Sequence, residues 1–395
     1  MIPLARRLQE LAPSATLEVL NAAAARRARG LEVVDLGPGE PDYPTPEPIR
    51  AAAIEALDQG FTHYTPAGGT RELRAAIADN VNRRYGSAYP AAEVVVGAGA
   101  KQVLFNIFQV LLDPGDEVVL AAPYWVSFPA MIETAGGRVA AVLGRAEDNF
   151  TVHAAPLLER VGPKTRAVVI NSPCNPTGAV MPPAELERLV DGLAGRPVLL
   201  ISDECYEPFV YDGAPVSAAQ YAGRARERML VAYSFSKSYA MTGWRIGYGI
   251  GPRHLIDAMI NLQSHSTSNP NSIAQQAALA ALNGSQQSVT EMVAEFKQRR
   301  RLAMERLGRI SALTCVEPAG AFYLFVGVGK LLGGELRDDV AFAARLLEQD
   351  GVAVVPGTPF GCPGFIRLSY ATSRELLLRG LDLLDQFAKR YQASR

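Results

Sequence analysis

The sequence has no long hydrophobic run, no excess of either charge and no signal-like start. No stretch of about eighteen apolar residues occurs, so we expect no membrane-spanning helix. The 39 basic and 40 acidic residues leave a net charge of −1. That balance provides neither a basic field for nucleic acid nor a polybasic patch for a membrane surface. Arg6 and Arg7 bring charge too early for a secretory signal peptide.

Cysteine is also scarce. The four cysteines, Cys174, Cys205, Cys315 and Cys362, lack the paired spacing of a metal site. We therefore predict no bound metal, and we interpret the four as free thiols in a reducing cytoplasm. A chain of 395 residues with 48% hydrophobic residues is long and apolar enough to fold into two globular domains.

Strand-like apolar runs alternate with helix-like segments between residues 48 and 285. This alternation predicts an α/β fold, with a mostly parallel seven-stranded sheet flanked by helices on both faces. The expected strands are Val94–Val96, Glu117–Leu120, Val139–Val142, Ala167–Ile170, Val198–Ile201, Leu230–Tyr233 and Ile246–Ile250.

The two ends of the chain predict a second, smaller unit. A helix broken at Pro13 is expected near residues 4–30, and a long connecting helix at Glu291–Ile310. Three short strands and a final helix follow, at Phe322–Val326, Val352–Val355, Phe365–Leu368 and Glu375–Tyr391. We expect a small α+β domain built from both chain ends. The boundaries we assign are 1–47 for the N-terminal segment and part of this domain, 48–285 for the large cofactor-binding domain and 286–395 for the small C-terminal domain.

A polar cluster follows the expected strand that ends at Tyr233. It contains Ser234, Ser236 and Lys237, and Arg245 comes eight residues after the lysine. Hydroxyl groups and a guanidinium suit a phosphate, and a lysine in a dry site can form a Schiff base. Pyridoxal phosphate is the cofactor that needs both. Taken alone, this stretch has an alternative interpretation as a surface loop with ordinary charges.

Two further strand ends carry polar residues. Asn175 and the pair Asp203 and Tyr206 follow apolar runs, and ligands of open parallel sheets bind at the carboxyl ends of the strands. A buried aspartate can keep a pyridine nitrogen protonated, and Asn175 and Tyr206 are suited to the phenolic oxygen of the ring. Singly, Asn175 is compatible with a turn and Asp203 with a helix cap.

With these residues considered together, the sequence resembles the class I aminotransferases, which are pyridoxal phosphate enzymes of fold type I. The resemblance covers nearly the whole chain, and within the family it is strongest to bacterial aspartate aminotransferases of the subgroup that includes prephenate aminotransferases. The motifs that carry it are Pro13–Thr16, Gly37–Asp42, Tyr64–Gly69, Pro123–Ser127, Asn171–Gly178, Ser202–Tyr206, Ser234–Gly247 and Phe365–Tyr370.

The resemblance implies roles for individual residues. Lys237, Asp203 and Tyr206 form the catalytic set, with Lys237 as the Schiff-base lysine. The cofactor-binding set is Lys237, Asp203, Tyr206, Asn175, Trp125, Gly99, Ala100, Lys101, Ser234, Ser236, Arg245 and Tyr64. The substrate-binding set is Arg367, Gly39, Trp125, Asn175, Thr16, Lys101 and Ser264. Trp125 is expected to stack on the ring, and Arg367 to hold the α-carboxylate. Tyr64 and Ser264 are expected to reach the site of the partner subunit in a homodimer.

The glycine-rich stretch from Gly97 to Gln102 suggests a dinucleotide-binding loop, but Gln102 stands where the third glycine would be. The glycines still allow backbone amides at a helix start to approach an anion, here the cofactor phosphate. Family members often carry a serine near Gly99. Its absence leaves more of the anchoring to the amides, the two serines and Arg245.

The predicted activity is transamination between amino acids and 2-oxo acids, with L-aspartate and 2-oxoglutarate as the expected pair. The resemblance points to Thr16 and Lys101 as contacts of the distal carboxylate. A prephenate or aromatic aminotransferase, or a dual activity, is the nearest alternative, and a β-lyase uses the same fold and lysine. A cofactor-binding transcriptional regulator is disfavoured because the chain has no spare DNA-binding segment, and a dehydrogenase because of Gln102.

Overall fold

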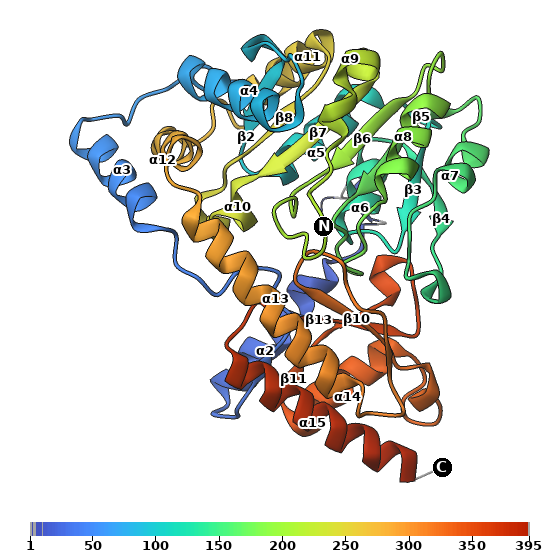
Figure 1. Ribbon diagram of the computed structural model, residues 1–395. Coiled ribbons are helices and arrows are strands. Elements are labelled where there is room, and N and C mark those ends of the chain that lie inside the picture. The colour runs from blue at the N-terminus through green and yellow to red at the C-terminus, as the bar shows by residue number, and fades with distance from the viewer. Residues whose placement is uncertain (1, 3–4, 10, 394–395) are drawn as a thin grey trace.

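A seven-stranded sheet forms the centre of the larger part of the molecule in the computed structural model, which describes residues 2, 5–9 and 11–393 (Figure 1). The strand order is β2-β8-β7-β6-β5-β3-β4, and only β8 runs antiparallel to its neighbours. All seven predicted strands are confirmed. Their bounds are β2 (Val94–Gly97), β3 (Glu117–Ala122), β4 (Arg138–Leu143), β5 (Thr165–Asn171), β6 (Leu199–Asp203), β7 (Met229–Ser234) and β8 (Gly247–Ile250).

Helices cover both faces of this sheet, as predicted. Alternate residues of β5 show the two faces, because Val168 and Ile170 enter one core and Ala167 and Val169 the other. The first core is completed by α3 (Glu47–Asp58), α4 (Arg71–Tyr85), α7 (Ala154–Arg160), α8 (Pro183–Gly192), α9 (Ala222–Ala225) and α12 (Ser272–Asn283). The second is completed by α5 (Ala100–Leu111), α6 (Ser127–Thr134) and α11 (Arg253–Ser264). Strands buried on both faces read as continuous apolar runs, which is why they were predictable.

The smaller part is an α+β unit made from both chain ends, which confirms that prediction. Near the N-terminus are α1 (Arg6–Gln9), α2 (Ala15–Ala28) and β1 (Val34–Asp35), and Leu4 of the predicted helix lies outside the described residues. β1 pairs in parallel with β11 (Val352–Ala353). The four-stranded sheet has the order β12 (Val355–Pro356), β13 (Phe365–Ser369), β10 (Tyr323–Gly327) and β9 (Thr314–Cys315). The helices α13 (Gln287–Leu307), α14 (Asp339–Asp350) and α15 (Arg374–Ala393) pack around them.

One predicted strand of this unit is wrong in detail. Val352–Val355 is divided into β11 and β12, because its first half pairs with β1 and its second half pairs antiparallel with β13. The proposed domain boundaries at 47 and 285 stay predictions. Among the described helices, none is both long and apolar enough to cross a membrane. All four cysteines are free thiols.

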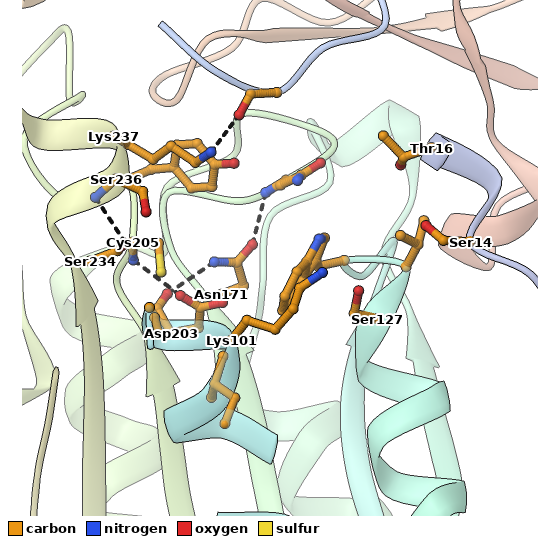
Figure 2. A pocket seen from close by; sticks show the side chains of 18 of the residues that line it. Ser14, Thr16, Lys101, Ser127, Asn171, Asp203, Cys205, Ser234, Ser236 and Lys237 are labelled. Carbon is orange, nitrogen blue, oxygen red and sulfur yellow. Dashed lines mark hydrogen bonds between the residues drawn. The ribbon is translucent and has the colours of Figure 1, made fainter. Parts of the chain in front are cut away.

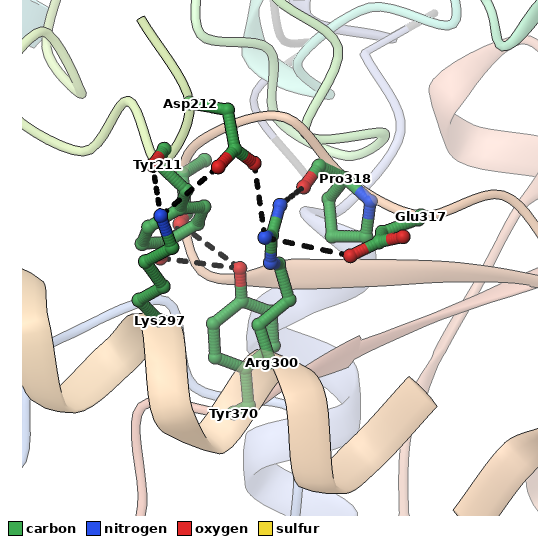
Figure 3. A network of polar contacts seen from close by, with 8 residues as sticks. Tyr211, Asp212, Lys297, Arg300, Glu317, Pro318 and Tyr370 are labelled. Carbon is green, nitrogen blue, oxygen red and sulfur yellow. Dashed lines mark hydrogen bonds and ion pairs between the residues drawn. The ribbon is translucent and has the colours of Figure 1, made fainter. Parts of the chain in front are cut away.

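The loop that follows β6 joins the large sheet to the small unit by packing into the core of that unit. Its residues Tyr206, Phe209 and Tyr211 belong to the hydrophobic core of the small unit rather than to that of the sheet. Polar contacts reinforce this join (Figure 3). Asp212 accepts hydrogen bonds from Lys297 Nζ at 2.9 Å and from Arg300 Nη2 at 3.1 Å, both on α13.

Arg300 is the buried member of this network. Its side chain is 9% exposed, against 45% for Lys297. Arg300 Nη1 also donates to the Pro318 carbonyl at 2.8 Å, and the guanidinium lies 4.9 Å from the centre of the Tyr211 ring. Burial makes hydrogen bonds to a charged group costly to lose, whereas an exposed ion pair contributes little.

We therefore expect Arg300→Met to lower the free energy of unfolding by about 2 kcal/mol, since the Pro318 carbonyl loses its donor and the ring loses its cation. The matched substitution Lys297→Met, on the same helix and facing the same carboxylate, should cost below about 1 kcal/mol. Urea unfolding of both variants measures the difference. Equal losses would show that burial does not set the contribution of these side chains.

Candidate active site

A cavity of about 410 Å³ lies at the carboxyl ends of the large sheet, where the sheet faces the small unit (Figure 2). The ends of β5, β6 and β7 contribute Asn171, Asp203 and Ser234 to its wall. The small sheet contributes Tyr323 and Arg367. The start of α5 and the start of α2 form the remaining sides. Residues far apart in the sequence therefore meet here because the sheet topology brings their strand ends together.

Most of the predicted site residues line this cavity. They are Thr16, Gly39, Gly99, Ala100, Lys101, Trp125, Asn175, Asp203, Tyr206, Ser234, Ser236, Lys237, Arg245 and Arg367. Tyr64 and Ser264 do not line it. Tyr64 is 89% exposed and Ser264 is exposed at the end of α11. Both were expected to act in a partner subunit, so their roles stay predictions.

Lys237 lies on the short helix α10 (Phe235–Ser238), which begins directly after β7. Its ammonium donates to the Gly39 carbonyl at 2.5 Å. Burial lowers the pKa of Lys237 to about 8, and the positive charges of Arg245 and Arg367 act in the same direction. With this pKa about one-tenth of the amine is unprotonated at pH 7, against less than about one-thousandth for an ordinary lysine, and the unprotonated form is what a nucleophile or a general base requires.

Asp203 is 4% exposed at the end of β6, and its Oδ1 accepts the Cys205 backbone N–H at 3.1 Å. Burial raises the pKa of this carboxyl, although the nearby Lys237 counteracts part of the effect. No described arginine, lysine or histidine forms an ion pair with it. A buried carboxylate without a counter-ion is costly, so a cationic group bound in the cavity would be stabilised beside it.

An anion cradle lies where α5 begins. Gly99 precedes the helix with a φ of 80°, and a Cβ there would come within 2.8 Å of Arg245 Nη2. The backbone N–H groups of Ala100 and Lys101 donate to none of the described residues. Helix N-termini with free N–H groups attract anions, and the hydroxyl groups of Ser234 and Ser236 and the guanidinium of Arg245 face the same cavity. This donor set fits a phosphate dianion.

Arg367 comes from β13 of the small sheet and is 2% exposed. Its Nη1 donates to Asn175 Oδ1 at 2.9 Å and its Nη2 to the Gly37 carbonyl at 2.6 Å, while its Nε has no partner among the described residues. Burial lowers the pKa of this guanidinium, and no carboxylate of the described chain pairs with it. A buried guanidinium with a free donor fits a carboxylate ligand.

Several lining residues were missed. The Tyr206 and Tyr323 hydroxyls are 2.6 Å apart, and Tyr323 OH also lies where a Cβ on Gly39 would be, at 2.5 Å. This close approach explains why residue 39 is glycine. Tyr323 begins a strand that looks like ordinary core, so no local signal marked it. Asn171, which donates to the Asp203 carbonyl at 3.0 Å, lay inside a recognised motif without being selected.

The side of the cavity toward α2 is different in character. Lys101 Nζ lies 4.9 Å from the centre of the Trp125 ring, and burial, followed by the charge of Arg245, lowers the pKa of this lysine. The hydroxyls of Ser14, Thr16 and Ser127 line the same side (Figure 2). Lys101 and these hydroxyls provide a second place for an anionic group.

A buried carboxylate at the end of β6, a partly buried lysine after β7 and a phosphate-sized cradle at the start of α5 are the groups that a pyridoxal phosphate-dependent enzyme of α/β fold requires. The unpaired Asp203, the open Ala100 and Lys101 amides and the uncharged fraction of Lys237 each match one functional group of that cofactor: the ring nitrogen, the phosphate and the aldehyde.

Comparison with known proteins agrees with this class. The family model described as "Aminotransferase class I and II" matches residues 32–384. An aspartate aminotransferase of Geobacillus stearothermophilus is 44% identical over 97% of this chain and 98% of its own length. An aspartate/prephenate aminotransferase of Cereibacter sphaeroides is 44% identical, covering 96% and 97%. The Thermus thermophilus aspartate aminotransferase structure with maleate superposes with a TM-score of 0.93 at 43% identity, covering 98% of this chain and 100% of that one.

The chain belongs to the class I and II aminotransferase family, which confirms the resemblance found in the sequence. It is an aminotransferase, and pyridoxal 5′-phosphate is its cofactor.

The lowered pKa of Lys237 predicts a measurable reactivity. In the cofactor-free protein, reductive methylation of Lys237 should rise with pH with a midpoint near 8, whereas an ordinary lysine has a pKa of about 10.4. Peptide mass spectrometry after brief labelling at a series of pH values reports the Lys237 midpoint separately from other lysines. A midpoint close to 10 would show that the Lys237 ammonium is not destabilised by burial.

Proposed function

We propose that the enzyme transfers the amino group of L-aspartate to 2-oxoglutarate, forming oxaloacetate and L-glutamate. The observation that carries this proposal is the pair of cationic groups in one cavity: Arg367 on the small sheet and Lys101 at the start of α5. A substrate with two carboxylates satisfies both, whereas a monocarboxylic amino acid leaves Lys101 unpaired. The relatives named aspartate aminotransferases support aspartate as the amino donor.

The anion cradle would hold the cofactor phosphate, through the Ala100 and Lys101 amides, Ser234, Ser236 and Arg245. Asp203 would hold a proton on the pyridine nitrogen, which supplies the cationic partner that this buried carboxylate lacks. Asn175 and Tyr206 would bind the phenolic oxygen, and Trp125 would lie against the ring face. When bound, the cofactor supplies an electron sink for the electrons released at the substrate α-carbon.

Lys237 is the proposed base. Its amine, once released from its covalent attachment, would take the proton from the substrate α-carbon and return it at the cofactor carbon that receives the nitrogen. The low pKa of the lysine suits this role because the unprotonated amine is available near neutral pH. Arg367 would orient the α-carboxylate so that the α-hydrogen faces Lys237.

Prephenate is the second candidate acceptor. The distal anion site is made of an ammonium and hydroxyl groups. Among the described residues that line the cavity, the arginines are Arg245, beside the anion cradle, and Arg367, on the small sheet. An ammonium is a compact charge without the planar fork of arginine, so it tolerates carboxylates in different positions. The exposed Leu17 and Leu20 beside it offer apolar surface for a ring. Relatives named aspartate/prephenate aminotransferases agree with this alternative.

A panel of amino donors against 2-oxoglutarate, oxaloacetate and prephenate tests the proposed function. We expect aspartate and glutamate to be the best donors. Lys101→Ala should raise the KM for aspartate at least about tenfold while changing that for alanine less than about threefold, because only the dicarboxylic substrate loses a charged contact.

Ser127→Ala removes a hydroxyl of the same wall without removing a charge, and it serves as the matched control with a smaller effect. If phenylalanine or alanine proves the best donor, or if Lys101→Ala impairs every donor equally, the aspartate assignment fails. The transaminase activity itself would remain.

We also propose that the enzyme is a homodimer with shared sites, working in the cytoplasm. Tyr64 is a large aromatic residue that is 89% exposed, and it lies in a motif whose counterpart in the family reaches the partner's cofactor phosphate. The four free thiols are compatible with a reducing compartment.

Mixing two impaired variants tests the shared site. Tyr64→Ala and Lys237→Ala, denatured and refolded together, should form heterodimers in which one site has both intact residues. Random pairing would restore about one quarter of the parental activity, well above the activity of either variant refolded alone. Activity in the mixture equal to the mean of the two separate variants would contradict a site shared in this way.

A further inference from the structure

The side chain of Gln102 connects the turn of the anion cradle to the loop after α11. Its Oε1 accepts the Ala98 backbone N–H at 2.5 Å, and its Nε2 donates to Thr267 Oγ1 at 2.6 Å on the loop after α11. Gln102 stands where a dinucleotide-binding loop would have its third glycine. The proposed transamination assigns no role to its side chain.

The position of Gln102 on α5 explains what these two hydrogen bonds do. Gln102 is the third residue of α5, and Gly99 before the helix has no side chain with which to cap it. A glutamine at this position of a helix commonly reaches back to satisfy an N–H group at the helix start. Here it takes the Ala98 N–H, and the Gly97 carbonyl takes the Gly99 N–H at 2.8 Å. The N–H groups of Ala100 and Lys101 are left for a ligand.

The strand that leads into the cradle is held by a second glutamine. Gln263 is fully buried, and its Nε2 donates to the carbonyls of Val96 at 2.8 Å and Ala67 at 2.6 Å. Its Oε1 accepts from Asn106 Nδ2 at 3.1 Å, on α5 itself. The strand before Gly97 is therefore held by Gln263. The turn between Gly97 and Ala100 is held by Gln102 at the Ala98 N–H and by Arg245 Nη2, which donates to the Ala98 carbonyl at 3.3 Å.

We propose that Gln102 is a positioning residue for the cofactor phosphate. It acts through the Ala98 N–H, and it sets the direction in which the Ala100 and Lys101 N–H groups point. This inference rests on the proposed placement of the phosphate at the start of α5. Without the side-chain bond, the Ala98 N–H competes for other acceptors, the turn loosens and the two amides no longer converge on one anion.

Gln102→Met tests the inference because it keeps the volume of the side chain and removes both hydrogen bonds. Gln109→Met is the matched control, since Gln109 lies two turns along the same helix and its buried Nε2 has no partner among the described residues. Two quantities are measured: the Kd of the cofactor-free protein for pyridoxal phosphate, and the ³¹P NMR shift of the bound phosphate.

We expect Gln102→Met to weaken cofactor binding about tenfold, which corresponds to the loss of one or two hydrogen bonds. The ³¹P resonance should move, because the phosphate loses its fixed donors. Gln109→Met should change the Kd less than about twofold and leave the resonance in place. Thr267→Val, which removes only the outer hydrogen bond, should fall between the two.

The inference is overturned if Gln102→Met binds the cofactor as Gln109→Met does. It is also overturned if the Kd rises but the ³¹P shift is unchanged and the Tm of the cofactor-free protein falls in proportion, because Gln102 would then serve stability alone. Failure of the phosphate placement is recognised separately: Ser236→Ala and Arg245→Met would then leave both the Kd and the ³¹P shift of the parent unchanged.

Discussion

The active site depends on three charged groups that have no counter-ion among the described residues. Asp203 and Arg367 are buried, Lys237 is partly buried, and none of them forms an ion pair with a described side chain of opposite charge. Isolated buried charges destabilise a folded protein, so they persist only where something else compensates for them. In the proposed enzyme the compensation would come from cofactor and substrate: a protonated ring nitrogen beside Asp203, a carboxylate on Arg367, and an aldehyde that would bond to the uncharged amine of Lys237.

The architecture makes this desolvation possible. The large sheet alone would leave its strand ends facing solvent, and the small unit closes over them with Tyr323 and Arg367. The loop after β6 joins the two parts, since Asp203 ends a strand of the large sheet and Tyr206, three residues later, is packed in the core of the small unit. Any change in how the parts meet is therefore transmitted directly to the position of the Tyr206 hydroxyl.

Much of the fold and most of the site could be predicted from the sequence. Apart from the edge strand β4, which is largely exposed, the strands of the large sheet are buried on both faces, so each is a continuous apolar run that stands out without context. The strands β1 and β9 have two residues each and carry no periodicity, and the division of Val352–Val355 depends on partners elsewhere in the chain. Charged or amide residues at strand ends were recognisable because such groups are out of place beside an apolar run.

The parts that escaped prediction depend on contacts between distant segments. The contact of Tyr323 with Gly39 and Tyr206, and that of Arg367 with Asn175, join residues that are far apart in the chain. Tyr206, Asn175, Arg367 and Gly39 were selected from their motifs, but the partner of each could not be predicted, and Tyr323 has no local signature at all. Gln102 was noticed only as a missing glycine, because its distant partner, Thr267, becomes a neighbour only through the packing of α11 against α5.

The bond from Gln263 to the Ala67 carbonyl has a consequence for the assembled enzyme. Ala67 lies three residues after Tyr64, so a single buried side chain holds both the strand entering a subunit's own phosphate cradle and the segment proposed to reach across to its neighbour. In the proposed dimer, filling one cradle and associating two chains would then be linked equilibria, each favouring the other by the same factor. Dilution would strip cofactor, and cofactor would oppose dissociation by mass action.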